Sequence, residues 1–337
     1  MKGKRIFVLM LVTVILLSAT MAACGNNTSS NSEGSSGDGG NSIDANGAGL
    51  IGFSHFSAGA NNYCTIYDNR IKEYQKEAYP DITLVSLDAQ GDATKQLDQV
   101  NDLISQNVDV AIIWPVSSTG IITGLEALDK AGIPVINTNS GVDAAGADLV
   151  AAFSGPSDYK QGFQAGEAMI EALGGKGNVV ELAGLAGYDT ATQRSAGFAD
   201  AIKDTEIVLL ESQPTDWSSE KAQSIMETYI TKYGDDIDGI YCADDGISKG
   251  AMNALESVGK NDGSLPITSC TLFASGYDAI AEGKQYASVL QSPILDAELA
   301  LDLAVKVARG EAIEYDNRIQ TFIITKDNYS EFDRPTW

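Results

Sequence analysis

The sequence is poor in the residues that most enzymes use for catalysis. Among 337 residues there is a single histidine, His55, and there is neither a Gly-x-Ser-x-Gly motif nor a cluster of metal-ligating residues. Adjacent Asp244 and Asp245 do not form a catalytic pair, because neighbours in sequence usually point in different directions. A lone histidine is more often structural than catalytic, although the position of His55 after the first predicted strand leaves a ligand contact open. We therefore expect no catalytic residue, no metal and no cofactor.

The sequence also lacks a glycine-rich phosphate-binding loop. The first predicted strand is not followed by Gly-x-Gly-x-x-Gly, and Gly-x-x-x-x-Gly-Lys-Ser/Thr does not occur. Gly174-Gly175-Lys176-Gly177 resembles such a loop, but it follows a predicted helix and precedes a predicted strand. We interpret it as the end of a helix and its turn.

Basic residues are few, with 22 Lys and Arg against 46 Asp and Glu and a net charge of −24. Such acidity argues against binding to nucleic acid and to anionic lipid.

Cysteines are too few and too irregularly spaced to form a disulfide framework. Besides Cys24 there are three, Cys64, Cys242 and Cys270. The last two lie in apolar, strand-like runs, so we interpret them as buried small hydrophobic residues. One bridge between Cys242 and Cys270 is left open.

The longest predominantly apolar segment, Ile6 to Leu17, has about a dozen residues, fewer than the roughly 20 that a spanning helix needs. It follows three basic residues and is followed by Met21-Ala22-Ala23-Cys24, which is typical of a signal peptide over 1–23. The small residues before Cys24 resemble a lipobox, with Met21 where leucine is commonest. We expect a lipidated Cys24 and a flexible Gly/Ser/Asn linker over 24–49 that anchor an extracytoplasmic domain to the bacterial cell membrane. The alternative is an ordinary secretory signal with an incidental cysteine.

After the linker, short apolar runs alternate with amphipathic stretches, which predicts βα units around parallel sheets. The length suits two domains of about 100–150 residues, each binding ligand at the carboxyl ends of its strands. The predicted strands are Leu50–Phe53, Ile82–Leu87, Val110–Ile113, Pro134–Ile136, Leu149–Phe153, Val179–Leu182, Ile207–Leu210, Gly239–Cys242, Ile267–Thr271 and Ala287–Leu290.

Several segments resemble the type I periplasmic solute-binding proteins of ABC importers, the ribose- and galactofuranose-binding kind. They include Gln99 to Ile104, Ile112 to Val116, Ala131 to Ile136, Gln193 to Phe198 and Ile247 to Ala251. The resemblance implies two doubly wound parallel-sheet domains joined by a hinge of three crossings. It places the N-terminal lobe at 50–153 plus 292–318 and the C-terminal lobe at 154–291 plus 319–337.

The resemblance also implies ligand-binding residues in the N-terminal lobe. Asn61, Asn62 and Tyr63 follow the first strand, where the family has an asparagine and an aromatic residue; a helix cap and a core tyrosine are the alternative. Trp114 directly follows the third strand, and we expect its ring to stack on the ligand. Asn139, with Ser140, stands where ribose-binding proteins usually carry an Asp-Arg pair; an exposed loop asparagine is the alternative.

In the C-terminal lobe the resemblance implies four further ligand-binding residues. Arg194 is expected to grip two vicinal oxygens, and Trp217 to stack on the ligand opposite Tyr63. Asp244 of the Asp244-Asp245 pair is expected to face the ligand while the other carboxylate faces the helix from Ile247. Gln291 lies at both a crossing and the pocket.

The acidic contact that the family has near Thr271 is missing, and the sequence does not show which residue replaces it. We expect an extracytoplasmic binding subunit that captures a sugar or polyol in a closing cleft and docks on ABC permease transmembrane subunits. It is expected to be a monomer that contacts the membrane through its lipid alone and binds no nucleic acid. Presentation of the ligand to a chemoreceptor or sensor kinase is the alternative; an enzyme is a weaker one.

Overall fold

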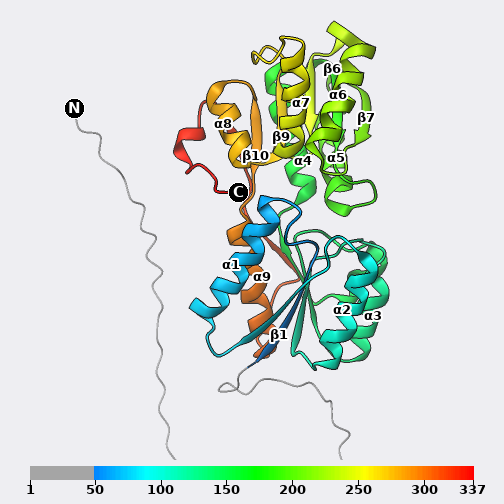
Figure 1. Ribbon diagram of the computed structural model, residues 1–337, viewed down its shortest axis with the longest axis vertical. Coiled ribbons are helices and arrows are strands. Elements are labelled where there is room, and N and C mark those ends of the chain that lie inside the picture. Colours follow the sequence, from blue (N-terminus) through cyan, green and yellow to red (C-terminus); the bar gives the residue numbers. More distant parts are fainter. Residues whose placement is uncertain (1–48) are drawn as a thin grey trace, which may run out of the picture. The chain divides into compact units, whose positions relative to one another are not determined.

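The computed structural model describes residues 49–337, which form two α/β lobes, each built on a six-stranded sheet (Figure 1). The predicted fold class of two doubly wound parallel-sheet domains is confirmed. The predicted signal peptide, the lipidated Cys24 and almost all of the linker lie outside the described residues.

The first sheet is entirely parallel and has the order β11-β5-β4-β3-β1-β2. Its strands are β1 (Leu50–His55), β2 (Thr83–Asp88), β3 (Val110–Ile113), β4 (Val135–Thr138), β5 (Ala152–Gly155) and β11 (Asp316–Arg318). Its helices are α1 (Asn62–Ala78), α2 (Ala93–Ser105), α3 (Ile122–Lys130), the 3-10 turn η1 (Ala144–Leu149) and α9 (Pro293–Ala308).

The second sheet has the order β12-β10-β9-β8-β6-β7, and only β12 is antiparallel to its neighbour. Its strands are β6 (Lys176–Ala183), β7 (Glu206–Pro214), β8 (Gly239–Cys242), β9 (Ile267–Thr271), β10 (Ala287–Leu290) and β12 (Phe322–Thr325). Its helices are α4 (Asp158–Leu173), α5 (Asp189–Ile202), α6 (Ser219–Tyr233), α7 (Asp245–Ser257) and α8 (Ala274–Glu282), with short turns η2 (Gly234–Asp236) and η3 (Tyr329–Glu331).

The first crossing between the lobes lies after Gly155, two residues later than the predicted boundary. Ser154 pairs with Thr138, and Gly155 pairs with Arg318, so both still belong to the first sheet. Small polar residues at a strand end carry no apolar signal, and the polar edge strand β11 was not predicted for the same reason. The predicted strand Leu149–Phe153 was wrong at its start, because Leu149 ends the turn η1.

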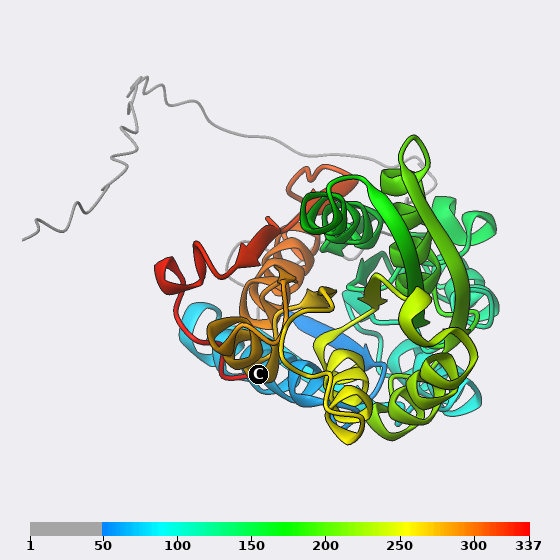
Figure 2. The same cartoon turned by 90° about the horizontal axis from the view of Figure 1, so that it is seen from above.

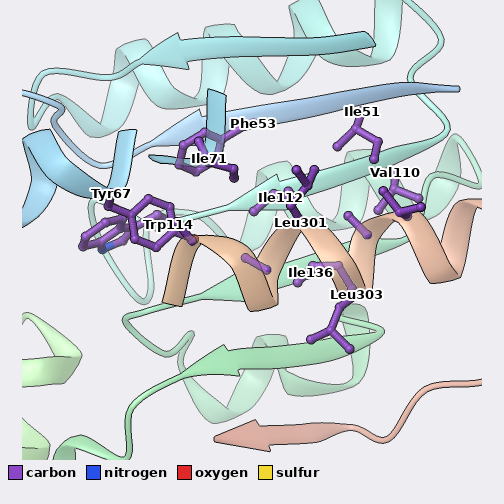
Figure 3. Close-up of a cluster of buried hydrophobic side chains, with 14 of the residues drawn as sticks. Ile51, Phe53, Tyr67, Ile71, Val110, Ile112, Trp114, Ile136, Leu301 and Leu303 are labelled. Carbon is purple, nitrogen blue, oxygen red and sulfur yellow. The ribbon is translucent and has the colours of Figure 1, made fainter. Parts of the chain in front are cut away.

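Each sheet is covered on both faces by helices, and the cores lie between them. In the first lobe α9 packs beside α1, and its Leu301 and Leu303 lie against Val110, Ile112 and Ile136 of the sheet (Figure 3). A second cluster lies under α2 and α3. In the second lobe the corresponding clusters lie under α6 with α7 and under α4 with α5.

The C-terminal segment comes back to the first lobe, on the side of α1 and α9 in the view from above (Figure 2). The last residue, Trp337, packs in the same cluster as Leu301, and its carbonyl oxygen accepts a hydrogen bond from the N–H of Ala274 at 2.6 Å. The end of the chain therefore contacts both lobes.

Two local predictions are confirmed. Helix α4 ends at Gly174 with φ of 65°, so Gly174-Gly175 is a helix terminus and turn. Cys242 and Cys270 are fully buried free thiols, so the bridge that was left open is not formed.

Replacing Leu301 by alanine tests the packing of α9. Leu301 is 0% exposed, so Leu301→Ala leaves a cavity and should lower the free energy of unfolding by about 2–5 kcal/mol in urea denaturation. Leu295→Ala on the same helix is the control, because Leu295 is 54% exposed and should change that free energy by less than about 0.5 kcal/mol. Equal losses in the two variants would contradict the packing described.

Candidate functional site

A cavity of about 350 Å³ lies between the carboxyl ends of the two sheets, a volume within the range of small-molecule sites. Eight of the nine predicted ligand-binding residues line it: Asn61, Tyr63, Trp114, Asn139, Arg194, Trp217, Asp244 and Gln291. Both lobes contribute to its wall. The prediction for Asn62 was wrong: Asn62 is the first residue of α1, its side chain is exposed, and it does not line the cavity.

Arg194 is the charged centre of the second-lobe wall and is 2% exposed. Its Nε donates to Asp158 Oδ1 at 3.1 Å, and its Nη1 donates to the Ala243 carbonyl at 2.7 Å and to Thr271 Oγ1 at 3.2 Å. Its Nη2 donates to Gln291 Oε1 at 3.2 Å. Because arginine has five N–H groups, these four bonds leave one for a ligand, rather than the two-pronged grip that the sequence predicts.

Close packing of α4 on α5 holds this arginine in place. A Cβ on Gly162 would lie 1.9 Å from the Arg194 carbonyl oxygen, and a Cβ on Gly197 would lie 2.0 Å from the Tyr159 carbonyl oxygen. Only glycine allows such an approach of the two helix backbones. The approach brings Asp158 at the start of α4 to the guanidinium of Arg194 on α5.

Gln291 is oriented by its neighbours. Its Oε1 accepts from Arg194 and, at 2.6 Å, from Gln161 Nε2. The amide nitrogen of Gln291 has no partner among the described residues, and the residue lines the cavity. Gln291 therefore presents a hydrogen-bond donor to the cavity.

On the first-lobe wall, Asn61 and Tyr63 combine structural bonds with places in the lining. Asn61 Oδ1 caps α1 by accepting from the Cys64 N–H at 2.9 Å, which matches the alternative of a helix cap. Its amide nitrogen remains without a partner among the described residues. Tyr63 is 3% exposed and donates its hydroxyl to Asp296 Oδ2 at 2.9 Å.

Asn139 directly follows β4 and has a backbone in the left-handed region, with φ of 61°. Asparagine tolerates this backbone better than most residues. Its Nδ2 donates to Asp296 Oδ2 at 2.7 Å. Asn139 is buried in the wall, so the alternative of an exposed loop asparagine is wrong.

Trp114 bridges the lobes across the cavity, because its Nε1 donates to the Tyr188 hydroxyl at 2.8 Å. Behind it lies His55, with ring centroids 4.7 Å apart. His55 is 0% exposed and does not line the cavity, and its Nδ1 accepts from the Ser57 N–H at 2.9 Å. Burial lowers the pKa of His55 to about 4, so the ring is neutral at neutral pH and its role is structural.

Trp217 has a φ of 59°, and its indole ring packs against Gly184. A Cβ on Gly184 would lie 2.3 Å from the indole, so a larger residue there would displace the ring. The ring contact of Trp217 is with Tyr188, at 6.3 Å and nearly perpendicular, whereas Tyr63 lies edge-on to Trp114 at 6.2 Å. A ligand held between Trp217 and Tyr63 stays a prediction.

The two adjacent aspartates divide their roles differently from the prediction. Asp244 lines the cavity and also caps α7, because its Oδ1 accepts from the Ile247 N–H at 2.7 Å. Asp245 points into the lobe, where it accepts from Gln285 Nε2 at 2.7 Å and from the Ser288 hydroxyl at 2.9 Å. The prediction that the second carboxylate would face the helix was therefore wrong.

Thr271 and Phe273 stand where the family's acidic contact is missing. Both line the cavity, and Thr271 accepts from Arg194. Thr271 has φ of 89° and Leu272 φ of 54°. Positive φ at a β-branched residue costs of order 1–3 kcal/mol, so the surrounding structure holds this turn in place.

Sequence reasoning missed three aromatic lining residues, Phe56, Tyr188 and Phe273. Phe56 and Tyr188 lie 5.4 Å apart, one from each lobe. Both follow the carboxyl end of a strand, β1 and β6, and that position is the signal that could have found them. The cavity thus combines aromatic faces with hydrogen-bonding edges, which suits a ligand with hydroxyls on an apolar frame.

Residues 49–337 have neither a metal-binding cluster nor a membrane-spanning helix. In that range there is no group of three or more His, Cys, Asp or Glu side chains that could hold a metal ion. No helix in the same range has the length and apolar character needed to cross a bilayer.

Residues 51–312 match the family described as periplasmic binding protein domain. The chain belongs to this family. Its members are solute-binding proteins, and membership implies an extracytoplasmic location.

Relatives within the periplasmic binding protein family are similar over most of their length. A xylitol-binding protein of Mycolicibacterium smegmatis is 29% identical over 248 residues, which cover 73% of this chain and 70% of the relative. A ribose import binding protein of Haemophilus influenzae is 28% identical over 252 residues, covering 75% and 83%. An ABC transporter solute binding protein from Bacillus halodurans, solved with bound myo-inositol, superposes with a TM-score of 0.79 and 28% identity over 85% of this chain and 97% of that chain.

The pH dependence of stability tests the environment of Asp244. Burial raises the pKa of Asp244 from 3.8 to about 6, so between these values the folded state binds more protons than the unfolded state. Stability contributed by this group therefore falls as pH rises from about 4 to about 6. Asp244→Asn keeps a good helix cap and removes the titration.

In urea denaturation, the drop in the free energy of unfolding between pH 4 and pH 7 should be smaller in Asp244→Asn than in the wild type by about 2–3 kcal/mol. An unchanged drop in Asp244→Asn would show that Asp244 titrates normally.

Proposed function

We propose that this protein is the extracytoplasmic binding subunit of an ABC importer and that it captures a sugar or polyol in the cavity between its lobes. The observation that carries the proposal is the composition of the cavity wall: aromatic faces from both lobes surround donors and acceptors that have no partner within residues 49–337. Hydroxyl groups both donate and accept, so a polyhydroxylated ligand matches this mixture. Relatives named for xylitol and for ribose support the same class.

Closure of the lobes on the ligand is part of the proposal. Within the part of the chain that the structure describes, hydrogen bonds cross the cleft from Trp114 to Tyr188 and from the Gly141 N–H to Asp189 Oδ2 at 3.2 Å. Contacts of this kind stabilise a closed arrangement, and a ligand touching both walls adds to them. The closed form then docks on the transmembrane subunits of the permease.

The anchor at Cys24 belongs to the proposal as well. A lipidated Cys24 followed by a flexible linker would hold a monomeric binding domain near its permease without any protein surface in the bilayer. Labelling of intact cells with a fatty-acid analogue tests it: the wild type should be labelled, and Cys24→Ala should be released unlabelled.

Thermal melting of the mature protein against a panel of sugars and polyols tests the ligand class. At least one member should raise the melting temperature, because a ligand that binds only the folded state stabilises it. No shift with any member would overturn the proposal. Uptake of the identified ligand should then require the permease, which separates transport from presentation to a sensor.

Two substitutions locate the ligand in the cavity. Gln291→Glu keeps the oxygens that accept from Arg194 and Gln161 but removes the donor that faces the cavity, so we expect about a tenfold loss of affinity by calorimetry. Trp217→Ala removes an aromatic face and should cost at least about tenfold, with Trp217→Phe retaining more. Unchanged affinity in both variants, with the fold intact, would place the ligand elsewhere.

A further inference from the structure

Behind the first-lobe wall lies a buried carboxylate that does not touch the cavity. Asp296 on α9 is 0% exposed and is absent from the lining. Its Oδ2 accepts from the Tyr63 hydroxyl at 2.9 Å and from Asn139 Nδ2 at 2.7 Å. Its Oδ1 has no hydrogen-bond partner, and no Lys or Arg forms an ion pair with it, among residues 49–337.

This arrangement is not explained by stability. A buried carboxylate with an unpaired oxygen and no nearby cation is costly, and an uncharged side chain of similar size would cost less. The fold nevertheless provides space for the Asp296 side chain, because the residue beside it is a glycine, Gly155. A Cβ on Gly155, which has φ of 145°, would lie 3.3 Å from Asp296 Oδ1 and 3.0 Å from the backbone nitrogen of Asn139.

The carboxylate has one clear effect, which is to fix the direction of the Asn139 amide. A primary amide has a donor end and an acceptor end, and the oxygens of an ionised carboxyl group bond only the donor end. Burial raises the pKa of Asp296 to about 7, so Asp296 is ionised and bonds only the donor end above that pH. With Nδ2 held by Asp296, Oδ1 is the end left for the cavity, and it has no partner among the described residues. The Tyr63 proton is also directed to Asp296, so neither residue donates to the cavity.

The opposite wall has the reverse polarity. There the guanidinium of Arg194 holds Gln291 Oε1, which leaves the Gln291 amide nitrogen for the cavity. A ligand between the walls therefore meets an acceptor from the first lobe and a donor from the second. The two fixed amides distinguish one orientation of a ligand from its reverse.

We propose that Asp296 is a positioning residue that sets ligand specificity: by holding Asn139 it makes the first-lobe wall a hydrogen-bond acceptor, and so selects a ligand with an O–H donor at that position. The inference rests on the proposed function, because it takes the ligand to be a sugar or polyol. Asp296 acts through Asn139 and makes no contact with the ligand itself.

Analogues of the ligand found in the melting panel test the inference, each with one hydroxyl replaced by fluorine, which cannot donate. Calorimetry gives the ratio of parent to analogue affinity. In the wild type one position should show a ratio of at least about tenfold that falls to less than about threefold in Asn139→Ala; this position faces Asn139. If no position behaves in this way, the inference is wrong.

Asp296→Asn supplies the decisive comparison. An amide at 296 can donate to Asn139 Oδ1, so Asn139 is free to turn its Nδ2 to the cavity, where fluorine is tolerated. The ratio at the same position should fall below about threefold while the parent still binds. A ratio that stays at the wild-type value would overturn the inference. Should Asp296→Asn fail to fold, Asp296→Ser releases Asn139 with a smaller side chain, and the same fall is expected.

Asp302→Asn is the matched control. Asp302 lies on the same helix and also accepts from a tyrosine, the Tyr79 hydroxyl at 2.7 Å, but it does not line the cavity or contact Asn139. The ratio of parent to analogue affinity in Asp302→Asn should equal that of the wild type. A lower ratio in this variant would show that the loss follows from any substitution in α9. If no sugar or polyol binds the wild type, the proposed function fails; if one binds and the Asp296→Asn ratio is unchanged, this inference alone fails.

Discussion

The buried pair of Arg194 and Asp158 is the interaction on which the cavity depends. From one guanidinium, hydrogen bonds run to the start of α4, the end of β8, the end of β9 and the crossing at Gln291. Removing Asp158 would leave an uncompensated buried charge, and removing Arg194 would release four groups together. The pair exists because Gly162 and Gly197 let α4 and α5 approach to backbone contact.

The buried pair of Arg194 and Asp158 also determines which hydrogen-bonding groups the second-lobe wall presents to a ligand. Arg194 donates four hydrogen bonds to protein groups, and by holding Gln291 Oε1 it directs the Gln291 amide nitrogen toward the cavity. The first-lobe wall is arranged by a buried acidic group, Asp296, which turns the Asn139 amide the other way. One basic and one acidic side chain, in or behind the walls, thus orient neutral amides that face the space between the lobes. Aromatic rings from both lobes complete the enclosure, with Trp114 and Tyr188 joining the lobes directly.

Much of the fold and part of the cavity wall could be predicted from the sequence, because strands and their ends have local sequence patterns. Apolar runs located β3, β8, β9 and β10 at their observed bounds, polar residues after strands pointed to Asn139 and Asp244, and the family resemblance pointed to Arg194 at the start of a helix. Where the signal is weak the prediction failed: Ser154 and Gly155 extend β5 without any apolar pattern. Asn62 adjoins two lining residues, yet the turn of α1 points it to solvent.

The sequence by itself determined the fold class of two parallel-sheet domains, because periodicity and the position of strand ends are properties of short segments, and its resemblance to a known family pointed to eight residues of the cavity wall. Tertiary structure alone decided how those residues act. Asp296 lies 157 positions from Asn139, and Arg194 lies 97 from Gln291. No local pattern reveals that these pairs meet, and it is their contact that fixes which end of each amide faces the ligand.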